Sequence, residues 1–396
     1  MQFKTFILDP FQEDAVRSIE ENHSVVVSAA TGTGKTLIAE YVIDKSLKEH
    51  RRVVYTAPIK ALSNQKYRDF KEDYGEDAVG ILTGDVSINP GAPILIMTTE
   101  VYRNMLLSQE PDMDRFSYII FDEIHFINDP ERGVVWEESI IFSNPNVRFL
   151  CLSATIPNAR EFADWISSIQ NHPVDTVIYT KRAVPLRHYV FDAEWGIISG
   201  EEYKERLRRS RKQARKHHHP HRRFRQEKKS SSSSSRHIDL VRELTEEHAL
   251  PSLFFVFSRR ECQTMARQLA TAVDLATPQE KAQIMGAFNR IIDPEIRTMQ
   301  SVRLLRRVLE NGIGIHHAGL LPHLKEVVEK FFNQGLLKVL YCTETFAVGV
   351  NMPAKTVCFN SLEKYDGRSF RYLFSKEYFQ CAGRAGRRGI DTLGRS

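Results

Sequence analysis

The sequence predicts an α/β protein whose parallel sheets are covered by helices on both faces, and two observations point to this fold class. Short β-branched runs alternate with stretches of helical periodicity from the N-terminus onward, a pattern typical of parallel strands joined by helical crossovers. The same alternation begins again at residues 253–257. Because 396 residues are also enough for two cores, we expect two α/β domains.

In the first half, the expected strands are short runs of apolar and β-branched residues. They cover residues 25–28, 53–56, 94–97, 118–121, 149–152 and 176–179. Helical periods between them include residues 37–47, 59–70 and 159–166. Ligands of such sheets bind at the carboxyl ends of the strands, so motifs that directly follow these runs are the candidates for function.

The second half contains further expected strands at residues 338–342 and 356–360. An Asp-Gly pair at residues 366–367 lies between apolar and aromatic residues, which is a strong hairpin signal. It predicts hairpin strands near residues 356–363 and 369–374. The predicted domains are therefore residues 1–190 and 238–396.

Residues 191–237 differ sharply in composition from both predicted domains. Between Lys204 and Arg236, fourteen lysines and arginines stand against two acids, a net charge of +12 that leaves −7 for the rest of a chain whose total is +5. A run of six serines follows the basic residues. This composition buries too little apolar surface to offset the roughly 1–2 kcal/mol per residue that fixing a backbone costs. We expect a disordered insert that is either an electrostatic arm for phosphate backbones or a solvated linker.

Composition also excludes several classes of protein. No apolar run approaches the ~20 residues that span a bilayer, and no signal-peptide pattern opens the chain, so we expect no membrane partner. The five cysteines are scattered without a Cys-x-x-Cys pair. This spacing argues against a disulfide framework or a zinc site and indicates a reducing, cytoplasmic location.

A glycine-rich segment between an expected strand and an expected helix reads Ala-Ala-Thr-Gly-Thr-Gly-Lys-Thr. Its glycines allow successive N–H groups to converge on a phosphate, and the following helix N-terminus favours negative charge. Lys35 would contact the β- and γ-phosphates, and the Thr36 hydroxyl would hold Mg²⁺. The segment predicts a nucleoside triphosphate site formed by Ala29, Ala30, Thr31, Gly32, Thr33, Gly34, Lys35 and Thr36.

Two further motifs complement this loop. The strand expected at residues 118–121 ends in Asp122-Glu123, where Asp122 can hold Mg²⁺ and Glu123 can orient and deprotonate an attacking water. Near the end of the chain, Arg384 and Arg387 are three residues apart, a spacing that places them on one helical face. Arginines supplied by a second domain would stabilise charge on a transferring phosphoryl group. Gln12, before the first strand, could read the adenine edge.

In this order, the motifs resemble those of superfamily-two helicases, and the Asp-Glu-x-His box resembles the DExH type. Three longer segments are similar to the superkiller-type, exosome-associated RNA helicases: Asp-Pro-Glu-Arg-Gly-Val-Val-Trp-Glu-Glu at 129–138, Arg-Ala-Val-Pro-Leu at 182–186 and His-His-Ala-Gly-Leu-Leu-Pro at 316–322. The resemblance covers nearly the whole chain except the insert. It implies two tandem RecA-like domains.

The resemblance also implies ATP hydrolysis with Mg²⁺ at the cleft between the two domains, coupled to 3′-to-5′ movement on single-stranded RNA. By position, catalysis would fall to Lys35, Glu123, Gln380, Arg384 and Arg387, with Thr36 and Asp122 on the metal. Gln12, Gly349 and Asn351 would join the phosphate loop in binding the nucleotide. Coupling to domain movement would involve His125, Ser153 and Thr155, and the strand would contact Pro58, Lys60, Gly84, Thr99, Thr343 and Glu344.

Two alternatives stay open at this point. A DNA helicase of the related repair branch shares most of these motifs, and a nucleotide-gated RNA clamp or scaffold would share the fold without the catalysis. The resemblance implies an RNA-degrading exonuclease or exosome-like complex as a partner and RNA turnover or processing as the role. It also implies that the hairpin at residues 366–367 parts a duplex. The winged-helix and helical-bundle domains of the family are absent from the sequence.

Overall fold

The structure is a computed structural model that describes residues 1–110, 113, 115–154, 156–216, 233–344, 346 and 352–396. The chain forms two compact units, Met1–Ala183 and Val184–Ser396. The first unit therefore ends before the boundary predicted at residue 190. No helix in the part of the chain that the structure describes has both the length and the apolar character needed to cross a membrane.

The first unit is built on an eight-stranded sheet with the order β10-β3-β9-β8-β4-β7-β5-β6. Its strands are parallel except for β6, which pairs with β5 in the antiparallel sense. The sheet contains β3 (Ser24–Ala29), β4 (Arg52–Ala57), β5 (Val79–Leu82), β6 (Ser87–Ile88), β7 (Ile94–Thr98), β8 (Phe116–Phe121), β9 (Arg148–Ser153) and β10 (Val174–Tyr179). All six strands predicted in this half are confirmed.

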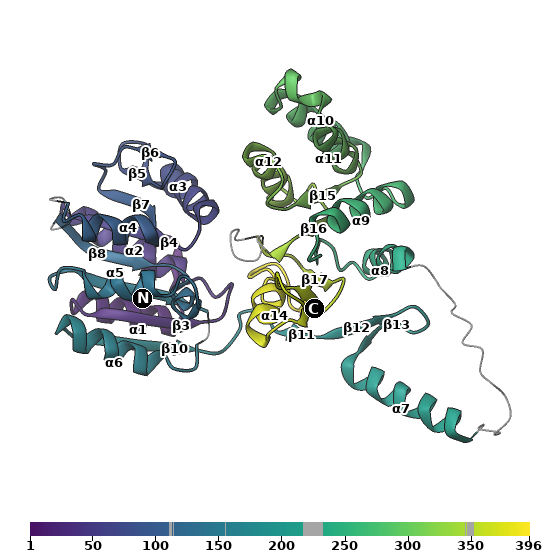
Figure 1. Ribbon diagram of the computed structural model, residues 1–396, viewed down its shortest axis with the longest axis horizontal. Helices are drawn as coiled ribbons and strands as arrows, with labels where there is room; N and C mark the ends of the chain where they lie inside the picture. The colour runs from purple at the N-terminus through teal and green to yellow at the C-terminus, as the bar shows by residue number, and fades with distance from the viewer. Residues whose placement is uncertain (111–112, 114, 155, 217–232, 345, 347–351) are drawn as a thin grey trace. The chain divides into compact units, whose positions relative to one another are not determined.

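Helices cover both faces of this sheet (Figure 1). Alternate residues of a strand point to opposite faces, and accordingly Val25 and Val27 of β3 lie in one core cluster while Val26 lies in another. The first cluster contains residues of α1 (Pro10–Glu20), α2 (Thr36–Lys48) and α3 (Lys60–Tyr74). The second contains residues of α4 (Thr99–Leu107), α5 (Val134–Ile141), α6 (Ala159–Gln170) and the 3₁₀ turn η2 (Ile124–Asn128). A small antiparallel pair, β1 (Gln2–Phe3) and β2 (Phe6–Ile7), precedes them.

The second unit has a six-stranded parallel sheet in the order β11-β20-β17-β14-β16-β15 and one continuous core. Its strands are β11 (Leu186–Arg187), β14 (Ser252–Phe255), β15 (Ile313–His316), β16 (Val339–Cys342), β17 (Thr356–Phe359) and β20 (Gly394–Arg395). Its helices include α8 (Ser233–Glu246), α9 (Arg259–Ala272), α10 (Pro278–Ile291), α11 (Gln300–Glu310), α12 (Pro322–Asn333) and α14 (Ser375–Ala382), with η3 (Pro294–Thr298) between α10 and α11. The predicted α/β class, with parallel strands and covering helices, is confirmed.

Part of the segment predicted as a disordered insert is ordered in the structure. A hairpin of β12 (Tyr189–Asp192) and β13 (Gly196–Ser199) leads into α7 (Gly200–Lys216). The hairpin is fastened to α8, because the Glu243 carboxylate accepts a hydrogen bond of 2.6 Å from the Ile197 N–H. On α7, ion pairs four residues apart, Arg206 with Glu202 and Arg209 with Glu205, offset the scarcity of apolar residues. Residues 217–232 of the predicted insert lie outside the described residues, and its last residues, from Ser233, belong to α8.

The hairpin predicted around residues 366–367 is correct in its turn and wrong in its first strand. Residues 356–359 form β17 inside the parallel sheet, and the hairpin consists of β18 (Glu363–Tyr365) and β19 (Phe370–Tyr372). The turn between them is closed by Asp366, whose carboxylate accepts hydrogen bonds of 2.8 Å from the N–H groups of Arg368 and Ser369. The turn could be predicted because its hydrogen bonds join neighbouring residues, whereas residues 356–359 pair with β14, about a hundred residues away in sequence.

Gly133, at the start of α5, has no room for a side chain. A Cβ there would lie 2.2 Å from the Ile127 carbonyl oxygen and 2.7 Å from that of Asp129. Because both neighbours are backbone atoms, Gly133→Ala should destabilise the unit by roughly 1–3 kcal/mol. Urea unfolding followed by tryptophan fluorescence measures this, since Trp136 is fully buried in the same unit. Gly91→Ala, where a Cβ meets nothing within 4 Å, is the control, and equal midpoints for the two variants would contradict the packing argument.

Candidate functional site

The motifs of the first unit follow six neighbouring strands of its sheet. In sheet order, β3, β9, β8, β4, β7 and β5 are followed by the glycine-rich loop, the segment after Ser153, Asp122-Glu123, the Pro58 loop, Thr99 and the Gly84 loop. Because these strands are parallel, their carboxyl ends meet at one edge. The sheet thus brings the predicted nucleotide residues to one end of that edge and the predicted strand-contact residues to the other.

The glycine-rich loop is closed by its own hydrogen bonds. Gly32 and Gly34 have φ angles of +80° and +89°, a region in which a Cβ is penalised. The Lys35 ammonium donates to the carbonyl oxygens of Ala29 at 2.7 Å and Ala30 at 3.2 Å, and α2 begins immediately after it, at Thr36. The predicted arrangement of strand, glycine-rich loop and helix is confirmed.

Gln12 is attached directly to this loop. Its side chain is 1% exposed; its Oε1 accepts a hydrogen bond of 2.8 Å from the Asp9 N–H, and its Nε2 donates 2.9 Å to the Gly34 carbonyl oxygen. These contacts make Gln12 a brace between the start of α1 and the phosphate loop, a role that the sequence pattern did not indicate. Contact of Gln12 with an adenine stays a prediction.

The two acids after β8 are held at the buried end of the strand. Asp122 accepts hydrogen bonds of 2.5 Å from the Tyr55 hydroxyl and 2.9 Å from the Glu123 N–H. Glu123 has φ +52°, an uncommon conformation for a residue with a side chain, of the kind found at functional sites. Tyr55, on the neighbouring strand β4, was missed by the sequence analysis because nothing local distinguishes it from a core residue.

Electrostatics link the lysine and the acids. Burial raises the pKa of Asp122, and the nearby Glu123 charge raises it further, whereas Lys66 and Lys35 lower it. Burial lowers the pKa of Lys35, while the charges of Glu123 and Asp122 raise it. The Lys35 ammonium is therefore stabilised by the two carboxylates, and the Asp122 carboxylate by Lys66 and Lys35.

Oxygen donors of the kind that Mg²⁺ prefers are gathered at this point. The Lys66 ammonium lies 3.5 Å from the Thr36 hydroxyl, and its charge lowers the pKa of Asp122, so one ammonium acts on both predicted metal ligands. A carboxylate and a hydroxyl are donors that fit a divalent ion.

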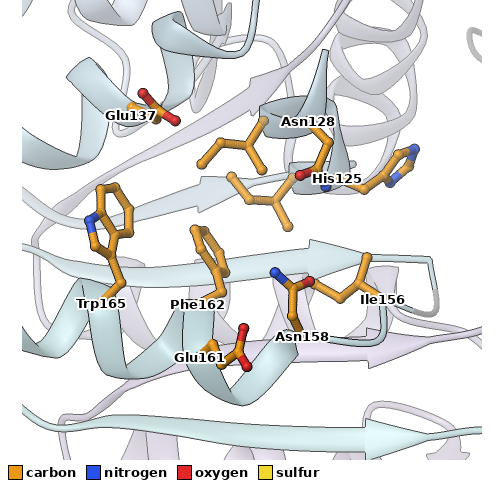
Figure 2. Close-up of a pocket in the computed structure, with 10 residues that line it drawn as sticks. His125, Asn128, Glu137, Ile156, Asn158, Glu161, Phe162 and Trp165 are labelled. Carbon is orange, nitrogen blue, oxygen red and sulfur yellow. The ribbon is translucent and has the colours of Figure 1, made fainter. Parts of the chain in front are cut away.

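Behind the acids, a pocket of about 290 Å³ separates η2 from α6. Figure 2 shows Phe162 and Trp165 along α6, with His125 on the opposite wall and its ring turned away from them. His125 Nδ1 lies 3.3 Å from Glu123 Oε2. Close packing therefore does not fill the space between η2 and α6, although Ile124 of η2 is anchored in the core.

The other predicted coupling residues lie at the end of β9. The Ser153 hydroxyl is buried and has no hydrogen-bond partner among the described residues. Thr155 lies outside the described part of the chain.

The predicted strand-contact loops of the first unit are fastened together by Arg132, which the sequence analysis quoted only within a longer motif. Its guanidinium donates 2.6 Å to the Pro58 carbonyl oxygen and forms an ion pair with Glu100, beside Thr99. It also lies over the Trp136 ring, 5.7 Å from the centroid. Arg132 thus joins the loop after β4 to the start of α4.

Two further predicted contacts in this unit lie together. Lys60 forms an ion pair with Asp85, and a Cβ on Gly84 would lie 3.6 Å from the Lys60 ammonium. The Thr99 hydroxyl is buried without a hydrogen-bond partner in the described residues, which leaves it able to serve an incoming acceptor after a small movement.

In the second unit, the structure modifies the predicted role of Glu344. Its carboxylate lies 2.8 and 2.7 Å from the Lys364 ammonium, a partner that the sequence pattern did not indicate, and its contact with a strand stays a prediction. Thr343 lines the same small cavity as Glu344 and Lys364. Gly349 and Asn351 lie outside the described residues.

The predicted arginines are not on a helix. The helix α14 carries Gln380 and ends at Ala382, and Gly386, with φ +90°, turns the chain between Arg384 and Arg387. The glycines therefore override the helical spacing. Arg384 is buried, with its guanidinium 5.9 Å from the centroid of the Phe346 ring.

Arg387 is held by Asp391, an acid that was not among the predicted site residues. Its guanidinium forms two hydrogen bonds to the carboxylate, of 2.8 and 2.9 Å, and its N–H a third of 2.9 Å. The Arg387 charge and these bonds lower the pKa of Asp391 against the effect of burial. An acid four residues after an arginine was a signal available in the sequence.

Comparison with known proteins agrees with this geometry. Residues 9–162 match the DEAD/DEAH box helicase family, and residues 268–389 match the helicase conserved C-terminal domain. The chain is 43% identical to the DExH-box ATP-dependent RNA helicase DExH9 of Arabidopsis thaliana, over 98% of this chain and 41% of that protein. It is 43% identical to the exosome RNA helicase MTR4 of Homo sapiens, over 98% of this chain and 38% of that protein.

A third relative belongs to the superkiller group that the sequence motifs resemble. The chain is 42% identical to the Superkiller complex protein 2 of Mus musculus, over 98% of this chain and 32% of that protein. The chain thus spans about two fifths or less of the length of these curated relatives. With the ordered motifs, the two matched helicase domains and these relatives, the chain belongs to the superfamily-two DExH-box helicases of the superkiller type.

Proposed function

We propose that this chain is the two-domain motor of an ATP-dependent RNA helicase that couples ATP hydrolysis to 3′-to-5′ movement on single-stranded RNA. The observation that carries the proposal is the cluster of Lys35, Asp122 and Glu123 beside a phosphate loop, in which both carboxylates act on the Lys35 ammonium. Hydrolysis of a bound triphosphate is the chemistry that these residue types serve.

In this proposal, Thr36 and Asp122 would hold Mg²⁺, which would supply positive charge against the charge of the phosphates. Lys35 exchanges its carbonyl partners in the loop for phosphate oxygens. Glu123 orients the attacking water and accepts its proton. His125 lies 3.3 Å from Glu123, so a change in the charge of that carboxylate acts on η2 through the His125 ring.

Arg384 and Arg387 are proposed to act from the second unit on the transferring phosphoryl group. Asp391 holds the Arg387 guanidinium in one orientation through two parallel hydrogen bonds. Such a pair fixes the planar group in advance, so less side-chain entropy is lost when it meets the phosphate.

The RNA assignment is supported by the kind of contact that the loops offer and by the relatives. Hydroxyl groups, backbone amides and lysines near Pro58, Lys60 and Thr99 suit phosphates and sugars and read no base sequence. Exposed aromatic rings on the β18–β19 hairpin suit base stacking, in keeping with duplex separation there.

The same relatives support the role that we propose. Several are named as RNA helicases, and MTR4 is named for the exosome, so we propose a role in RNA turnover with an exonuclease complex as partner. The five cysteines are buried free thiols, in keeping with a proposed cytoplasmic location.

A comparison of RNA and DNA tests the proposed substrate. ATP hydrolysis should rise at least tenfold with saturating single-stranded RNA and less with DNA of the same length and base sequence, because 2′-hydroxyl groups add contacts that DNA lacks. The rates are measured at one salt concentration, since phosphate contacts weaken with salt. Stronger stimulation by DNA would favour the repair-type DNA helicase. Hydrolysis at background level with either strand would favour a nucleotide-gated clamp.

Removal of Arg387 tests the catalytic assignment in the second unit. If its guanidinium stabilises the transferring phosphoryl group, Arg387→Ala should lower the RNA-stimulated turnover by about 10³–10⁵, or ~4–7 kcal/mol at the transition state. Arg388→Ala, which removes the neighbouring exposed arginine, is the control and should change turnover less than threefold. A loss below tenfold for Arg387→Ala would show that the role is misassigned.

A further inference from the structure

The β18–β19 hairpin has two faces of different chemistry. Lys364 lies directly opposite Arg371 in the pairing register, and Tyr365 lies opposite Phe370. On the outer face, Tyr365, Phe370 and Tyr372 are 57%, 76% and 71% exposed. On the other face lie the two cations, of which Lys364 is only 13% exposed in its side chain. One face is therefore aromatic and free, and the other is cationic and covered.

Like charges directly opposite each other destabilise a hairpin, and a carboxylate of α14 compensates for them. Glu377 Oε1 lies 2.7 Å from the Lys364 ammonium and 2.7 Å from Arg371 Nη2, while its Oε2 accepts 2.9 Å from Arg371 Nη1. The same Oε2 accepts a hydrogen bond of 2.8 Å from the Phe374 N–H. These contacts hold the pKa of Glu377 at about 2 in spite of burial, so the carboxylate is charged at any physiological pH.

Lys364 reaches a second carboxylate from a different segment. Its ammonium lies 2.8 and 2.7 Å from the two oxygens of Glu344. Glu344 and Glu377 belong to different segments, and in the described part of the chain the Lys364 ammonium lies within 2.8 Å of both carboxylates. Arg371, which is hydrogen-bonded to Glu377, acts on Glu344 through its charge. Partners of a largely buried cation are costly to separate.

The two carboxylates stand next to functional segments. Glu344 follows Thr343, a predicted strand contact, and both line a cavity of about 170 Å³ together with Arg259, Lys364 and Tyr365. Glu377 is on α14, which runs through Gln380 and ends two residues before Arg384. Lys364 therefore connects the aromatic hairpin, the strand-contact cavity and the segment that carries the arginines.

Strands of three residues are too short to hold an orientation by themselves. The angle of this hairpin relative to α14 is therefore set by the ion pairs on its cationic face. A displacement of the aromatic face by a bound strand would be passed to α14 through Glu377 and to Thr343 through Glu344.

We propose that Lys364 is a positioning residue that couples strand binding at the hairpin and its cavity to the arginine segment of the second unit. The inference rests on the proposed RNA-stimulated hydrolysis and adds a route for that stimulation. Lys364 touches neither nucleotide nor reacting atoms in this scheme.

The test separates the stimulation of hydrolysis from hydrolysis itself. For Lys364→Met, the ATPase rate without RNA should stay within twofold of the wild type, and the RNA concentration for half-maximal stimulation should change less than threefold. The maximal stimulation by saturating RNA should fall at least tenfold. Lys364→Arg, which keeps a cation between the two carboxylates, should retain at least half of the stimulation.

A matched control comes from another ion pair of the same unit. Lys338 lies 2.7 Å from Glu280, far from the hairpin in sequence, and Lys338→Met should leave the stimulation within twofold. Thermal unfolding verifies that each variant is folded, and Lys364→Gln, a smaller polar change, replaces Lys364→Met if that variant does not fold. A loss of stimulation in Lys338→Met as large as in Lys364→Met would mean that any lost ion pair has this effect, and would overturn the inference.

The outcomes for the inference and for the proposed function are distinct. Full stimulation of Lys364→Met beside a stimulated wild type would overturn the coupling role alone. Absence of stimulation in the wild type would overturn the proposed function, and the inference with it.

Discussion

The mutual stabilisation of Lys35 with Asp122 and Glu123 is the interaction on which the rest of the first unit depends. Each charge would be strongly unfavourable alone at the end of a buried strand, and all six residues of β3, which leads to the loop, are buried. The sheet must therefore bring β3 and β8 to the same edge with the right register. Residues that fix this register and the loop, such as Tyr55 and Gln12, serve the charge cluster through backbone and carboxylate contacts.

Sheet order then distributes two functions along one edge. Loops after β3, β9 and β8 carry the residues predicted to bind the nucleotide at one end, and those after β4, β7 and β5 carry the residues predicted to contact the strand at the other. Arg132 lies at the second end and joins two of its loops, so the strand-contact groups are held in one arrangement. In the second unit, Lys364 joins two segments in the same way, because its ammonium is paired with both Glu344 and Glu377. In both units, a cation with more than one partner fixes loops that the backbone alone does not fix.

Much of the fold and of the site follows from local sequence. The glycine-rich loop, the strand that ends in Asp122 and the Asp-Gly turn were predicted because their conformations depend on neighbouring residues. The contacts of Gln12 with Gly34, of Tyr55 with Asp122 and of Arg132 with Pro58 join residues far apart in sequence, and no pattern in one sequence specifies them.

The failed predictions have equally physical causes. Helix α7 was missed because a composition argument ignores ion pairs four residues apart. The arginines were placed on a helix because the spacing was counted without the positive φ of Gly386.

If Asp122 and the phosphate loop form one site for ATP with Mg²⁺, equilibrium binding of ATP must depend on both. ATP affinity is measured with and without Mg²⁺ for the wild type and for Asp122→Asn, which keeps the size of the side chain and removes its charge. We expect Mg²⁺ to tighten ATP binding at least tenfold in the wild type and less than threefold in the variant, because the variant lacks the carboxylate charge. Equal tightening in both proteins would contradict it.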